Sequence, residues 1–403
     1  MSKNSIPQIR FQGFDSWWET IKLTDLGISV GGTAIESEFD PDGKYKVISI
    51  GSYSEESKYK DQGIRAIHSK KTERRILEKD DLTMILNDKT STGKIIGRVL
   101  LIDEDNSYVY NQRTQRICLD KNKYVPDFIF QLLNADINRN KIVRSAQGNT
   151  QIYVNWSDIS NLDYLIPDSF DEQSAIGSLF HTLDDLLASY KDNLANYQSL
   201  KTTMLSKMFP KTGHTVPEIR LDGFEGEWKE KEFSKLVKRV TQSSDSDSLP
   251  KVEFEDIISG QGKLNKDIST KFDNRKGIHF KPGYTLYGKL RPYLNNWLLP
   301  KFEGVALGDF WVFDPNGNDS NFIYYLVQSN RYQKVANDTS GTKMPRSDWK
   351  SVSTTIFAIP QTIAEQQAIG AYFSNLDNLI NSYQDKISQL ETLKKKLLKD
   401  MFI

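Results

Sequence analysis

The chain repeats itself, and this repeat constrains its fold more than any other feature of the sequence. The segment IPQIRFQGFDSWWE at residues 6–19 recurs as VPEIRLDGFEGEWKE at residues 216–230, with matching residues 210 positions apart. The segment IPDSFDEQSAIGSLFHTLDDLLASY at residues 166–190 recurs at residues 359–383, with an offset of 193. The two stretches between the repeated blocks therefore differ in length by 210 − 193 = 17 residues. One architectural unit occurs twice with different contents.

The second repeated block has the spacing of a long coiled-coil helix. In the later copy one row recurs every seven positions from Ile369 to Leu397, and a second row runs from Phe373 to Met401. The earlier copy has the same two rows. A helix of about 40 residues would extend roughly 60 Å, and an apolar seam on such a helix needs a partner helix. We predict an inter-helix seam that includes Ile176, Phe180, Leu183, Leu187, Ile369, Phe373, Leu376 and Ile380.

Both helices are predicted to begin at a capping box. Ser169 with Glu172, and Thr362 with Glu365, fit the S/T-x-x-E pattern. In such a box the hydroxyl accepts a bond from a backbone N–H of the first turn, and the glutamate reaches back to the capping residue. An Ile-Pro step precedes each box and keeps the incoming chain extended.

One position in the second row of each helix is not apolar. It holds Lys201 in the earlier copy and Lys394 in the later copy. These lysines could extend their charged ends into water while Leu200 and Leu393 fill the seam. Because rows, caps and lysines coincide, the pattern favours two helices that pack on each other over two unrelated surface helices, each packed on its own domain.

The stretches between the repeated blocks read as ordinary mixed α/β domains. YKVISIGSY and TMILND in the first stretch, and YTLYGKL and GVALGDFWVF in the second, are apolar or alternating over the length of a strand. Gly, Pro, Asn and Asp lie at the ends of these runs, as expected for strands. Each stretch is long enough to form a core of its own.

Composition excludes several classes of protein. With 403 residues and 38% hydrophobic residues the chain can bury real cores, and no apolar run is long enough for a membrane span or a signal peptide. The one cysteine, Cys118, excludes an internal disulfide, and the four histidines show no metal-ligand spacing. We therefore expect a cytoplasmic protein without a metal site.

Basic residues are concentrated locally, although the whole chain is balanced. It has 53 basic and 53 acidic residues, and nucleic-acid-binding domains are usually basic overall. Between Lys271 and Lys301, however, seven Lys or Arg and the single acid Asp273 give a window of charge +6. In the first stretch STGKIIGR and NQRTQR bring guanidinium and amide groups together, which are the types that read guanine and adenine. A run of charged residues by itself more often marks a solvated surface than a DNA-binding site.

Catalytic motifs fail when they are checked residue by residue. STGK at residues 91–94 resembles a phosphate loop, but Asp88 replaces its first glycine and Ile95 replaces the magnesium-binding Ser or Thr. DPNG at residues 314–317 matches the Asp-Pro-Pro-Tyr loop of adenine methyltransferases for two residues only, and a turn explains it better. We predict no catalytic residues in this chain.

The order of these blocks resembles a known family. A short IPQIRF segment, a variable domain and an IPxxxxEQxAIGxxFxxLDxL helix, followed by all three again, are similar to the specificity subunit of type I restriction-modification systems. The resemblance covers the whole chain. It implies an α/β (α+β) fold with a pseudo-two-fold internal repeat, in which two long antiparallel coiled-coil helices separate two target-recognition domains. The implied boundaries are residues 1–165 and 213–358 for the domains, and 166–212 and 359–403 for the helices.

The resemblance also suggests which residues face DNA. LYGKLRPYL and GTKMPRSDWKSV are similar to segments of that family's target-recognition domains. The first domain departs from this pattern, because the residues around Gly148 are amides and no Lys-Arg pair matches Lys343 and Arg346. The expected DNA-binding residues are Lys94, Arg98, Asn111, Gln112, Arg113, Arg116, Gln147, Asn149, Tyr287, Lys289, Arg291, Tyr293, Thr342, Lys343 and Arg346.

The implied function is recognition of a split, asymmetric DNA site, one half per domain, by a non-catalytic host-defence subunit. Its partners would be double-stranded DNA, two methyltransferase subunits and two restriction (motor-nuclease) subunits, with no membrane. S-adenosylmethionine, ATP and Mg²⁺ would belong to those partners, and this chain would hold no cofactor. Two alternatives are a coiled-coil tether that joins two protein-binding domains, and a nuclease or methyltransferase with a degenerate motif.

Overall fold

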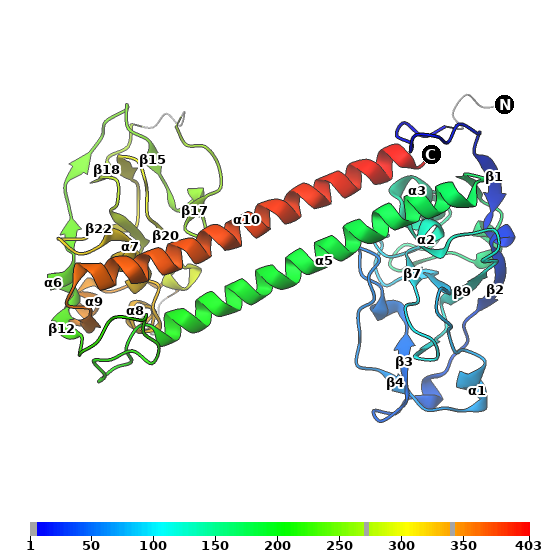
Figure 1. Ribbon diagram of the computed structural model, residues 1–403, viewed down its shortest axis with the longest axis horizontal. Coiled ribbons are helices and arrows are strands. Elements are labelled where there is room, and N and C mark those ends of the chain that lie inside the picture. The colour runs from blue at the N-terminus through cyan, green and yellow to red at the C-terminus, as the bar shows by residue number, and fades with distance from the viewer. Residues whose placement is uncertain (1–5, 270–273, 339–342) are drawn as a thin grey trace. The chain divides into compact units, whose positions relative to one another are not determined.

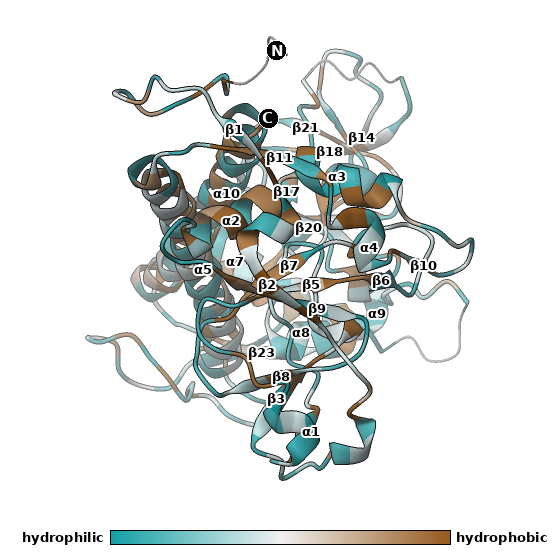
Figure 2. Ribbon diagram, turned by 90° about the vertical axis from the view of Figure 1, so that its right-hand side faces the viewer, coloured by the Kyte–Doolittle hydropathy of each residue, from teal (hydrophilic) through white to brown (hydrophobic). Residues whose placement is uncertain are grey.

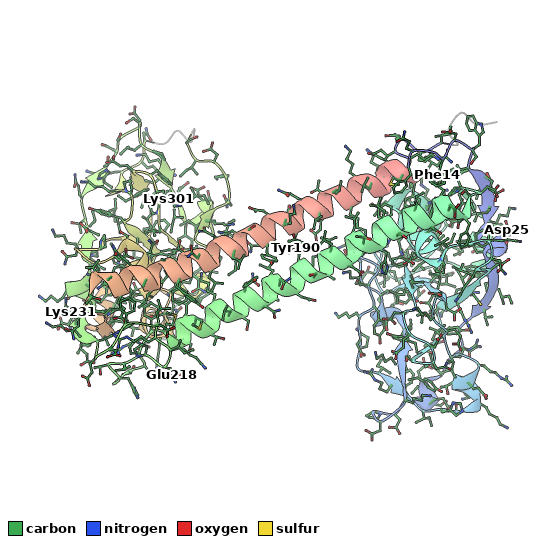
Figure 3. All side chains as sticks on the ribbon, in the orientation of Figure 1. Phe14, Asp25, Tyr190, Glu218, Lys231 and Lys301 are labelled. Atoms are coloured by element: carbon green, nitrogen blue, oxygen red, sulfur yellow. The ribbon has the colours of Figure 1, made fainter. Side chains whose placement is uncertain are left out.

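The longest elements are two helices, α5 (Phe170–Lys207) and α10 (Ile363–Met401), of 38 and 39 residues. The computed structural model describes residues 6–269, 274–338 and 343–403 and divides into two units (Figure 1). The first unit is Met1–Tyr190 with Lys386–Ile403, and the second is Lys191–Asp385. Each unit holds one end of both helices, and Tyr190, labelled in Figure 3, is the last α5 residue of the first unit.

The first domain is built from several small sheets. Its antiparallel four-stranded sheet has the order β2-β9-β5-β7, with bounds Gly27–Gly31, Thr114–Leu119, Leu82–Ile85 and Val99–Leu101. A second sheet has the order β4-β3-β8, with bounds Arg65–Ala66, Tyr45–Ile48 and Tyr108–Tyr110, and β3 and β8 are parallel. Two antiparallel pairs complete it: β1 (Glu19–Lys22) with β11 (Asp163–Ile166), and β6 (Asn87–Asp88) with β10 (Ile152–Tyr153).

Short helices connect and cover these strands. They are α1 (Lys70–Glu73), α2 (Pro126–Asn134), α3 (Asp136–Arg144) and α4 (Trp156–Ile159). Helix α2 packs against β7, and the side chains between the two larger sheets form a buried cluster that includes Ile48, Ile85 and Tyr110. In Figure 2 brown, hydrophobic segments occur on strands and on several helices, whereas α1 is mostly teal. The strands predicted in YKVISIGSY and TMILND are confirmed as β3 and β5.

The second domain repeats this plan. An antiparallel sheet has the order β13-β22-β19-β20, with bounds Lys238–Val240, Phe310–Asp314, Thr285–Gly288 and Trp297–Leu298. Another has the order β14-β18-β21-β15, with bounds Ser243–Ser244, Gly277–Phe280, Gly304–Ala306 and Lys251–Val252, and β15 and β21 are parallel. The pairs are β12 (Lys229–Glu232) with β23 (Ile356–Ile359), and β16 (Ile257–Ile258) with β17 (Lys263–Leu264). The helices are α6 (Phe233–Leu236), α7 (Ser320–Leu326), α8 (Asn330–Ala336) and α9 (Trp349–Thr354).

Within each unit the ends of α5 and α10 run antiparallel. In the first unit Phe180 contacts Phe402, with ring centroids 5.8 Å apart, and one helical turn along α5 the Asp184 carboxylate pairs with Lys394 at 2.5 Å. Residue numbers rise on α5 as they fall on α10, which defines the antiparallel direction. The predicted seam residues are largely buried: Ile176, Phe180, Leu183, Leu187, Ile369, Phe373, Leu376 and Ile380 are each at most 8% exposed.

The same contacts recur at the helix ends of the second unit. Phe209 stacks on Phe373, with centroids 6.1 Å apart, and Lys201 pairs with Asp377 at 2.7 Å. Each of these four residues lies 193 positions from its counterpart in the first unit. The ion pairs are partly buried and bind further groups, because the Asp184 carboxylate accepts from Gln131 and the Asp377 carboxylate accepts from Tyr325.

The suggestion that leucines replace the lysines in the seam is wrong. Leu200 and Leu393 are 41% and 44% exposed. The side chains of Lys201 and Lys394 are only 14% and 20% exposed, and each ammonium group is held by an aspartate of the facing helix. The lysines stay near the seam because the opposite helix supplies their counter-charge.

A buried carboxylate fastens the N-terminal segment of each repeat to its helix. Glu172 accepts hydrogen bonds from Arg10 at 2.6 and 2.7 Å and from the Trp18 indole at 3.3 Å. Glu365 does the same for Arg220, at 2.8 and 2.9 Å, and for Trp228, at 3.0 Å. In the predicted capping boxes, Ser169 and Thr362 do accept the backbone N–H three residues on. The two glutamates instead bind the arginine and tryptophan, which corrects that half of the prediction.

A glycine at each helix start permits close packing on the neighbouring domain. A Cβ added at Gly177 would come within 3.0 Å of the Phe128 backbone nitrogen, and one added at Gly370 would come within 2.7 Å of the Asn321 side chain. Helix α5 can therefore pack closely on α2 in the first unit, and helix α10 can pack closely on α7 in the second. No helix in the described part of the chain is long and apolar enough to cross a membrane.

Candidate nucleic-acid interface

Two segments of the second domain that are far apart in the sequence meet along their backbones. Leu290 and Arg346 form an antiparallel bridge. The Arg291 N–H donates to the Pro345 carbonyl at 2.7 Å, and the Ser347 N–H donates to the Lys289 carbonyl at 2.9 Å. We call residues 289–291 with 345–347 the second-domain edge. It brings LYGKLRPYL together with Pro345, Arg346 and Ser347 of the GTKMPRSDWKSV segment.

Asp309 organises the cations of this edge. Its carboxylate lies 3.0 Å from Arg346 Nη2 and 3.6 Å from Lys289 Nζ. Its carbonyl also accepts the Lys289 N–H at 2.9 Å. Arg346 is 51% exposed, and an ion pair that open contributes at most about 1 kcal/mol. The Asp309 carboxylate therefore orients Arg346 while leaving it able to exchange partners.

Arg291 has an unusual backbone. Its φ and ψ of 48° and 61° lie in the left-handed region, which residues with a side chain rarely adopt. Such a conformation costs on the order of 1–3 kcal/mol and persists only where the surroundings hold it. Here the bond to Pro345 and the turn that begins at Pro292 hold it. The Arg291 side chain is exposed, no described residue pairs with it, and Tyr293 is 58% exposed.

The first domain has an edge with the same backbone frame. Strands β6 and β10 pair Asn87 with Tyr153, and the Val154 N–H donates to the Leu86 carbonyl at 2.9 Å. The Leu86 N–H in turn donates to the Arg113 carbonyl at 2.9 Å. We call residues 86–88 with 152–154 the first-domain edge.

Matching hydrogen bonds align the two edges residue by residue. Val154 and Ser347, which are 193 positions apart, make the same bond to the strand opposite. The bond from Leu86 to Arg113 matches the bond from Lys289 to Asp309. The aligned pairs are Leu86 with Lys289, Asn87 with Leu290, Asp88 with Arg291, Tyr153 with Arg346, and Arg113 with Asp309.

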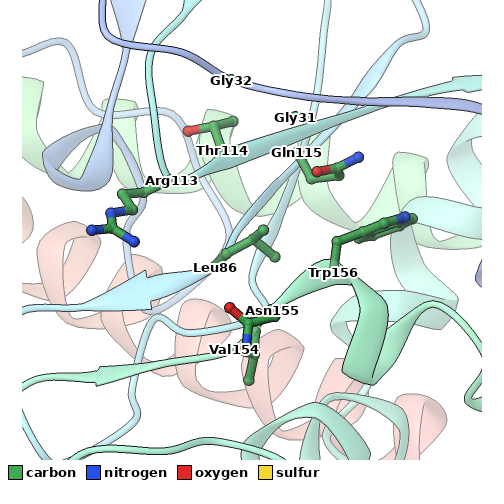
Figure 4. Close-up of a pocket in the computed structure, with 9 residues that line it drawn as sticks. All are labelled: Gly31, Gly32, Leu86, Arg113, Thr114, Gln115, Val154, Asn155 and Trp156. Atoms are coloured by element: carbon green, nitrogen blue, oxygen red, sulfur yellow. The ribbon is translucent and has the colours of Figure 1, made fainter.

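Two shallow cavities flank Arg113 in the first domain. One of about 190 Å³ also contacts Trp156 and Asn155, and in Figure 4 the Arg113 side chain points away from Trp156. The other, of about 350 Å³, lies beside Asn87 and Lys89. Arg113 has a positive φ of 68° and lines both cavities. No described residue forms an ion pair with its guanidinium.

The larger cavity holds a carboxylate fixed by amides. Glu36 Oε1 accepts from Asn111 Nδ2 at 3.0 Å and from Gln112 Nε2 at 2.9 Å. The hydrogen bond from Asn111 lowers the pKa of the Glu36 carboxyl, so the group is ionised at neutral pH. Asn111 Oδ1 is itself fixed, because it accepts from the Ile35 and Gln112 N–H groups at 3.1 and 2.8 Å. The cluster presents Glu36, Gln112 and Arg113 at one opening.

Gln147 and Asn149 lie on an exposed hairpin next to the first-domain edge. Gln147 and Tyr153 exchange two backbone hydrogen bonds of 2.9 Å. Gly148 closes the turn with a φ of 101°, and a Cβ there would come within 2.2 Å of the Gln151 carbonyl. The amide side chains of Gln147, Asn149 and Gln151 are all exposed.

The structure places four of the predicted residues in roles inside the domains. Tyr287 is completely buried and stacks near Trp311, so its side chain cannot reach DNA. Burial lowers the pKa of Arg98 to about 10, and its guanidinium donates to the Asn134 carbonyl. Arg116 pairs with the buried Asp81 at 2.7 Å. Asn111 is 7% exposed and positions its neighbours. We no longer assign direct DNA contacts to these four residues.

The remaining predicted residues are at the surface. Lys94 is exposed and pairs with Glu55 at 2.9 Å, and Lys343 is exposed at the start of the segment that leads to Arg346. Thr342 lies outside the described residues. In the described part of the chain no group of His, Cys, Asp or Glu side chains is arranged to hold a metal ion.

Sequence reasoning missed Glu36, Lys89 and Asp309. Glu36 belongs to a short 3₁₀ turn far from NQRTQR in the sequence, and only the fold brings the two together. Asp309 lies within the run GVALGDFWVF, which we interpreted only as a strand. The signal available for the edges was the alignment of the loop at Gly148 with the loop at Gly341, which lies 193 positions later, but it did not indicate which strand lies opposite.

A family model describes most of the chain. The model of the type I restriction modification DNA specificity domain matches residues 16–196 and 259–392. The two matched regions correspond to the two copies of the internal repeat.

Known proteins and solved structures agree with this match. The chain is 20% identical over 304 residues to the type I restriction enzyme EcoDI specificity subunit of Escherichia coli, covering 66% of this chain and 67% of that protein. A crystal structure of a type I restriction-modification system S subunit from M. genitalium superposes with a TM-score of 0.67 at 16% identity, covering 99% of both chains. A chain from a study of complex assembly and conformational transition of the type I R-M system gives a TM-score of 0.51 at 14% identity, covering 94% of this chain and 96% of that one. The predicted fold is confirmed by these likenesses.

Proposed function

Because the chain belongs to the type I restriction modification DNA specificity family, we propose that its two domains each read one half of a split, asymmetric DNA site. DNA sequence recognition in a type I restriction-modification system is the family's function. The observation that carries the asymmetry is the pair of aligned edges, which share a backbone frame but differ in side chains at every aligned position. Different base-edge donors and acceptors on one frame select different sequences.

Family membership also supports a proposal for the rest of the assembly. We propose that two methyltransferase subunits dock on this chain and methylate adenine, and that two motor-nuclease subunits add translocation and cleavage in the cytoplasm. S-adenosylmethionine, ATP and Mg²⁺ would then bind those partners. Partner subunits that enclose DNA would supply much of the phosphate contact, which suits a chain with no net charge.

Several of the predicted DNA contacts remain part of this proposal. For the first domain they are Lys94, Gln112, Arg113, Gln147 and Asn149, which are exposed or line the Arg113 cavities. For the second domain they are Lys289, Arg291, Tyr293, Lys343 and Arg346 on or next to the second-domain edge.

Methylation mapping tests the proposal. The chain is produced with its cognate methyltransferase subunit, and methylated adenines are located across a genome that lacks other adenine methylation. We expect one bipartite sequence with two different halves. Methylation by the isolated chain would contradict a non-catalytic role, and a chain that binds DNA without sequence preference, or not at all, would favour a tether between protein-binding domains.

A further inference from the structure

Hydrogen bonds hold the Glu36 carboxylate of the first domain in one orientation, in which it can act as an acceptor. Both amide donors bind the same oxygen, Oε1. The backbone N–H of Glu36 also donates a hydrogen bond to its own carboxylate, and the Glu36 side chain is exposed at the cavity. These anchors fix the orientation of the carboxylate, and its remaining lone pairs can accept from a ligand.

An ionised carboxylate on a DNA-facing surface needs a specific partner, because phosphates repel it. Among the groups in the major groove only the exocyclic amines, cytosine N4 and adenine N6, donate hydrogen bonds. Guanine presents two acceptors, O6 and N7, which suit a guanidinium group. Glu36 and Arg113 line the same cavity and offer one acceptor and one forked donor. That combination complements the edge of a G·C base pair, with its two acceptors and one donor.

We propose that Glu36 and Arg113 read one G·C base pair in the half-site of the first domain. This inference rests on the proposed function. Glu36 accepts from cytosine N4, and Arg113 donates to guanine O6 and N7. Asn111 acts as a positioning residue that holds the carboxylate, and the exposed Gln112 supports the carboxylate through Nε2.

The second domain lacks this device at its aligned position. The counterpart of Arg113 is Asp309, and its carboxylate forms ion pairs with Arg346 and Lys289. The second-domain edge therefore offers mainly donors, whereas the first domain offers an acceptor and a donor side by side. The proposed G·C contact is specific to the first half-site.

Glu36→Gln is the sharpest test, because it keeps the anchors and changes the outward atom. The glutamine oxygen can still accept from Asn111 and Gln112, while an NH₂ donor replaces Oε2. A donor there no longer suits cytosine N4 and suits guanine O6 or thymine O4 instead. Discrimination at one base pair should fall by roughly ten- to a hundredfold, or change its preferred base.

The experiment compares holo-complexes of the chain with its methyltransferase by methylation mapping and by competition binding to duplexes substituted at each position. Glu38→Gln is the matched control, because Glu38 lies in the same 3₁₀ turn but pairs with Lys71 at 3.5 Å. It should leave both half-sites unchanged. Arg113→Lys, which keeps the charge but loses the fork, should relax the same base pair as Glu36→Gln.

The outcomes separate this inference from the proposed function. A wild-type complex without any sequence-specific methylation would contradict the proposed function itself. A wild-type complex with a normal bipartite site, together with Glu36→Gln that keeps the wild-type first half-site, would overturn only the G·C contact. Weaker binding to all sequences alike would also overturn it, because it would show that Glu36 serves the fold alone. If Glu36→Gln does not fold, Arg113→Lys decides: relaxation at one G·C pair supports the contact, and an unchanged half-site refutes it.

Discussion

Asp309 and Arg113 occupy the same backbone position in the two domains, and this single exchange changes what each edge can bind. Asp309 gathers Arg346 and Lys289 around one carboxylate. In the first domain the Arg113 guanidinium forms no ion pair with a described residue, and it lines the same cavity as the fixed Glu36 carboxylate. Ion pairs this exposed are weak, so a base or phosphate can replace Asp309 at Arg346 with little loss. Under the proposed function, the backbone frame would set where the side chains point, and the side chains would set which bases are accepted.

Arg291 offers the clearest residue-level prediction for the second half-site. Its side chain is exposed, unpaired among the described residues, and carried on a left-handed backbone held by Pro345. Arg291→Ala should weaken recognition of the second half-site by roughly 1 to 3 kcal/mol, the value of one bidentate contact to guanine. Competition binding of the holo-complex to duplexes with single substitutions measures this loss.

Arg291→Lys is the matched variant, since it keeps the charge and loses the fork. If Arg291 reads a base, lysine should behave much like alanine; if it contacts phosphate, lysine should retain most of the affinity. Recognition of the first half-site serves as the internal control and should not change. Specific binding that survives both substitutions at physiological salt would show that this loop does not face DNA.

At the scale of elements, the heptad rows were sufficient to predict two long helices and their apolar seam positions. They could not predict which residues face Lys201 and Lys394, because periodicity describes one helix and the partner register depends on the direction of packing. The structure shows the lysines paired with Asp377 and Asp184. The capping boxes were half right for a similar reason. The glutamates had a stronger alternative partner, an arginine more than a hundred residues away.

The buried carboxylates lead to a stability prediction. Glu172 is fully buried, and the Arg10 side chain that it binds is only 9% exposed. Removing one member of a buried pair leaves the other charge without compensation, so Glu172→Gln should lower the free energy of unfolding by about 3–5 kcal/mol. Urea unfolding followed by tryptophan fluorescence can measure this, because Trp18 contacts the same carboxylate.

Asp171→Asn provides the control, since Asp171 is exposed in the same helical turn. Its cost should stay within about 1 kcal/mol, as expected for a charge near a helix N-terminus. Equal losses for both variants would mean that the contact between Arg10 and Glu172 contributes little to stability.

Helix length should set the spacer between the half-sites. More than one heptad of each helix lies between the contact of Asp184 with Lys394 in the first unit and the contact of Tyr197 with Tyr383 in the second. Deleting residues 188–194 and 386–392 keeps the seam phase and both lysine–aspartate pairs while shortening each helix by about 10 Å. About three base pairs span that length, so the mapped spacer should contract accordingly. An unchanged spacer would show that something other than the helices sets it.

At the scale of the whole molecule, the repeat carried most of what the sequence could predict. The offsets of 210 and 193 residues between the repeated blocks predicted two domains and two helices. The order of these blocks also carried the resemblance to the family. The candidate site was less predictable, because short basic motifs do not reveal burial. Tyr287 and Arg116 belong to the same kinds of motif as Arg291 and Arg113, yet the first is enclosed by aromatic rings and the second neutralises Asp81. Those differences arise from packing between strands that are distant in the sequence.

The repeat also makes each half of the chain complementary to a copy of itself. In the second unit Lys201 pairs with Asp377, whose counterpart in the first half is Asp184. Phe209 stacks on Phe373, whose counterpart is Phe180. A second copy of residues 1–215 can therefore offer Asp184 and Phe180 to the end of the first helix. These are the contacts that the second half supplies in the natural chain.

We therefore predict that residues 1–215 alone form an antiparallel dimer related by a true two-fold axis. Two identical recognition domains would then face DNA in opposed orientations, so the target of the complex with methyltransferase should become an inverted repeat of the first half-site. Sedimentation equilibrium and methylation mapping measure the two steps. Asp184→Lys should weaken the dimer by placing like charges opposite Lys201, and adding Lys201→Asp should restore it. A monomer at micromolar concentration would mean that the helices pair only when one chain tethers them, and a dimer with a non-palindromic target would mean that the two-fold does not relate the domains.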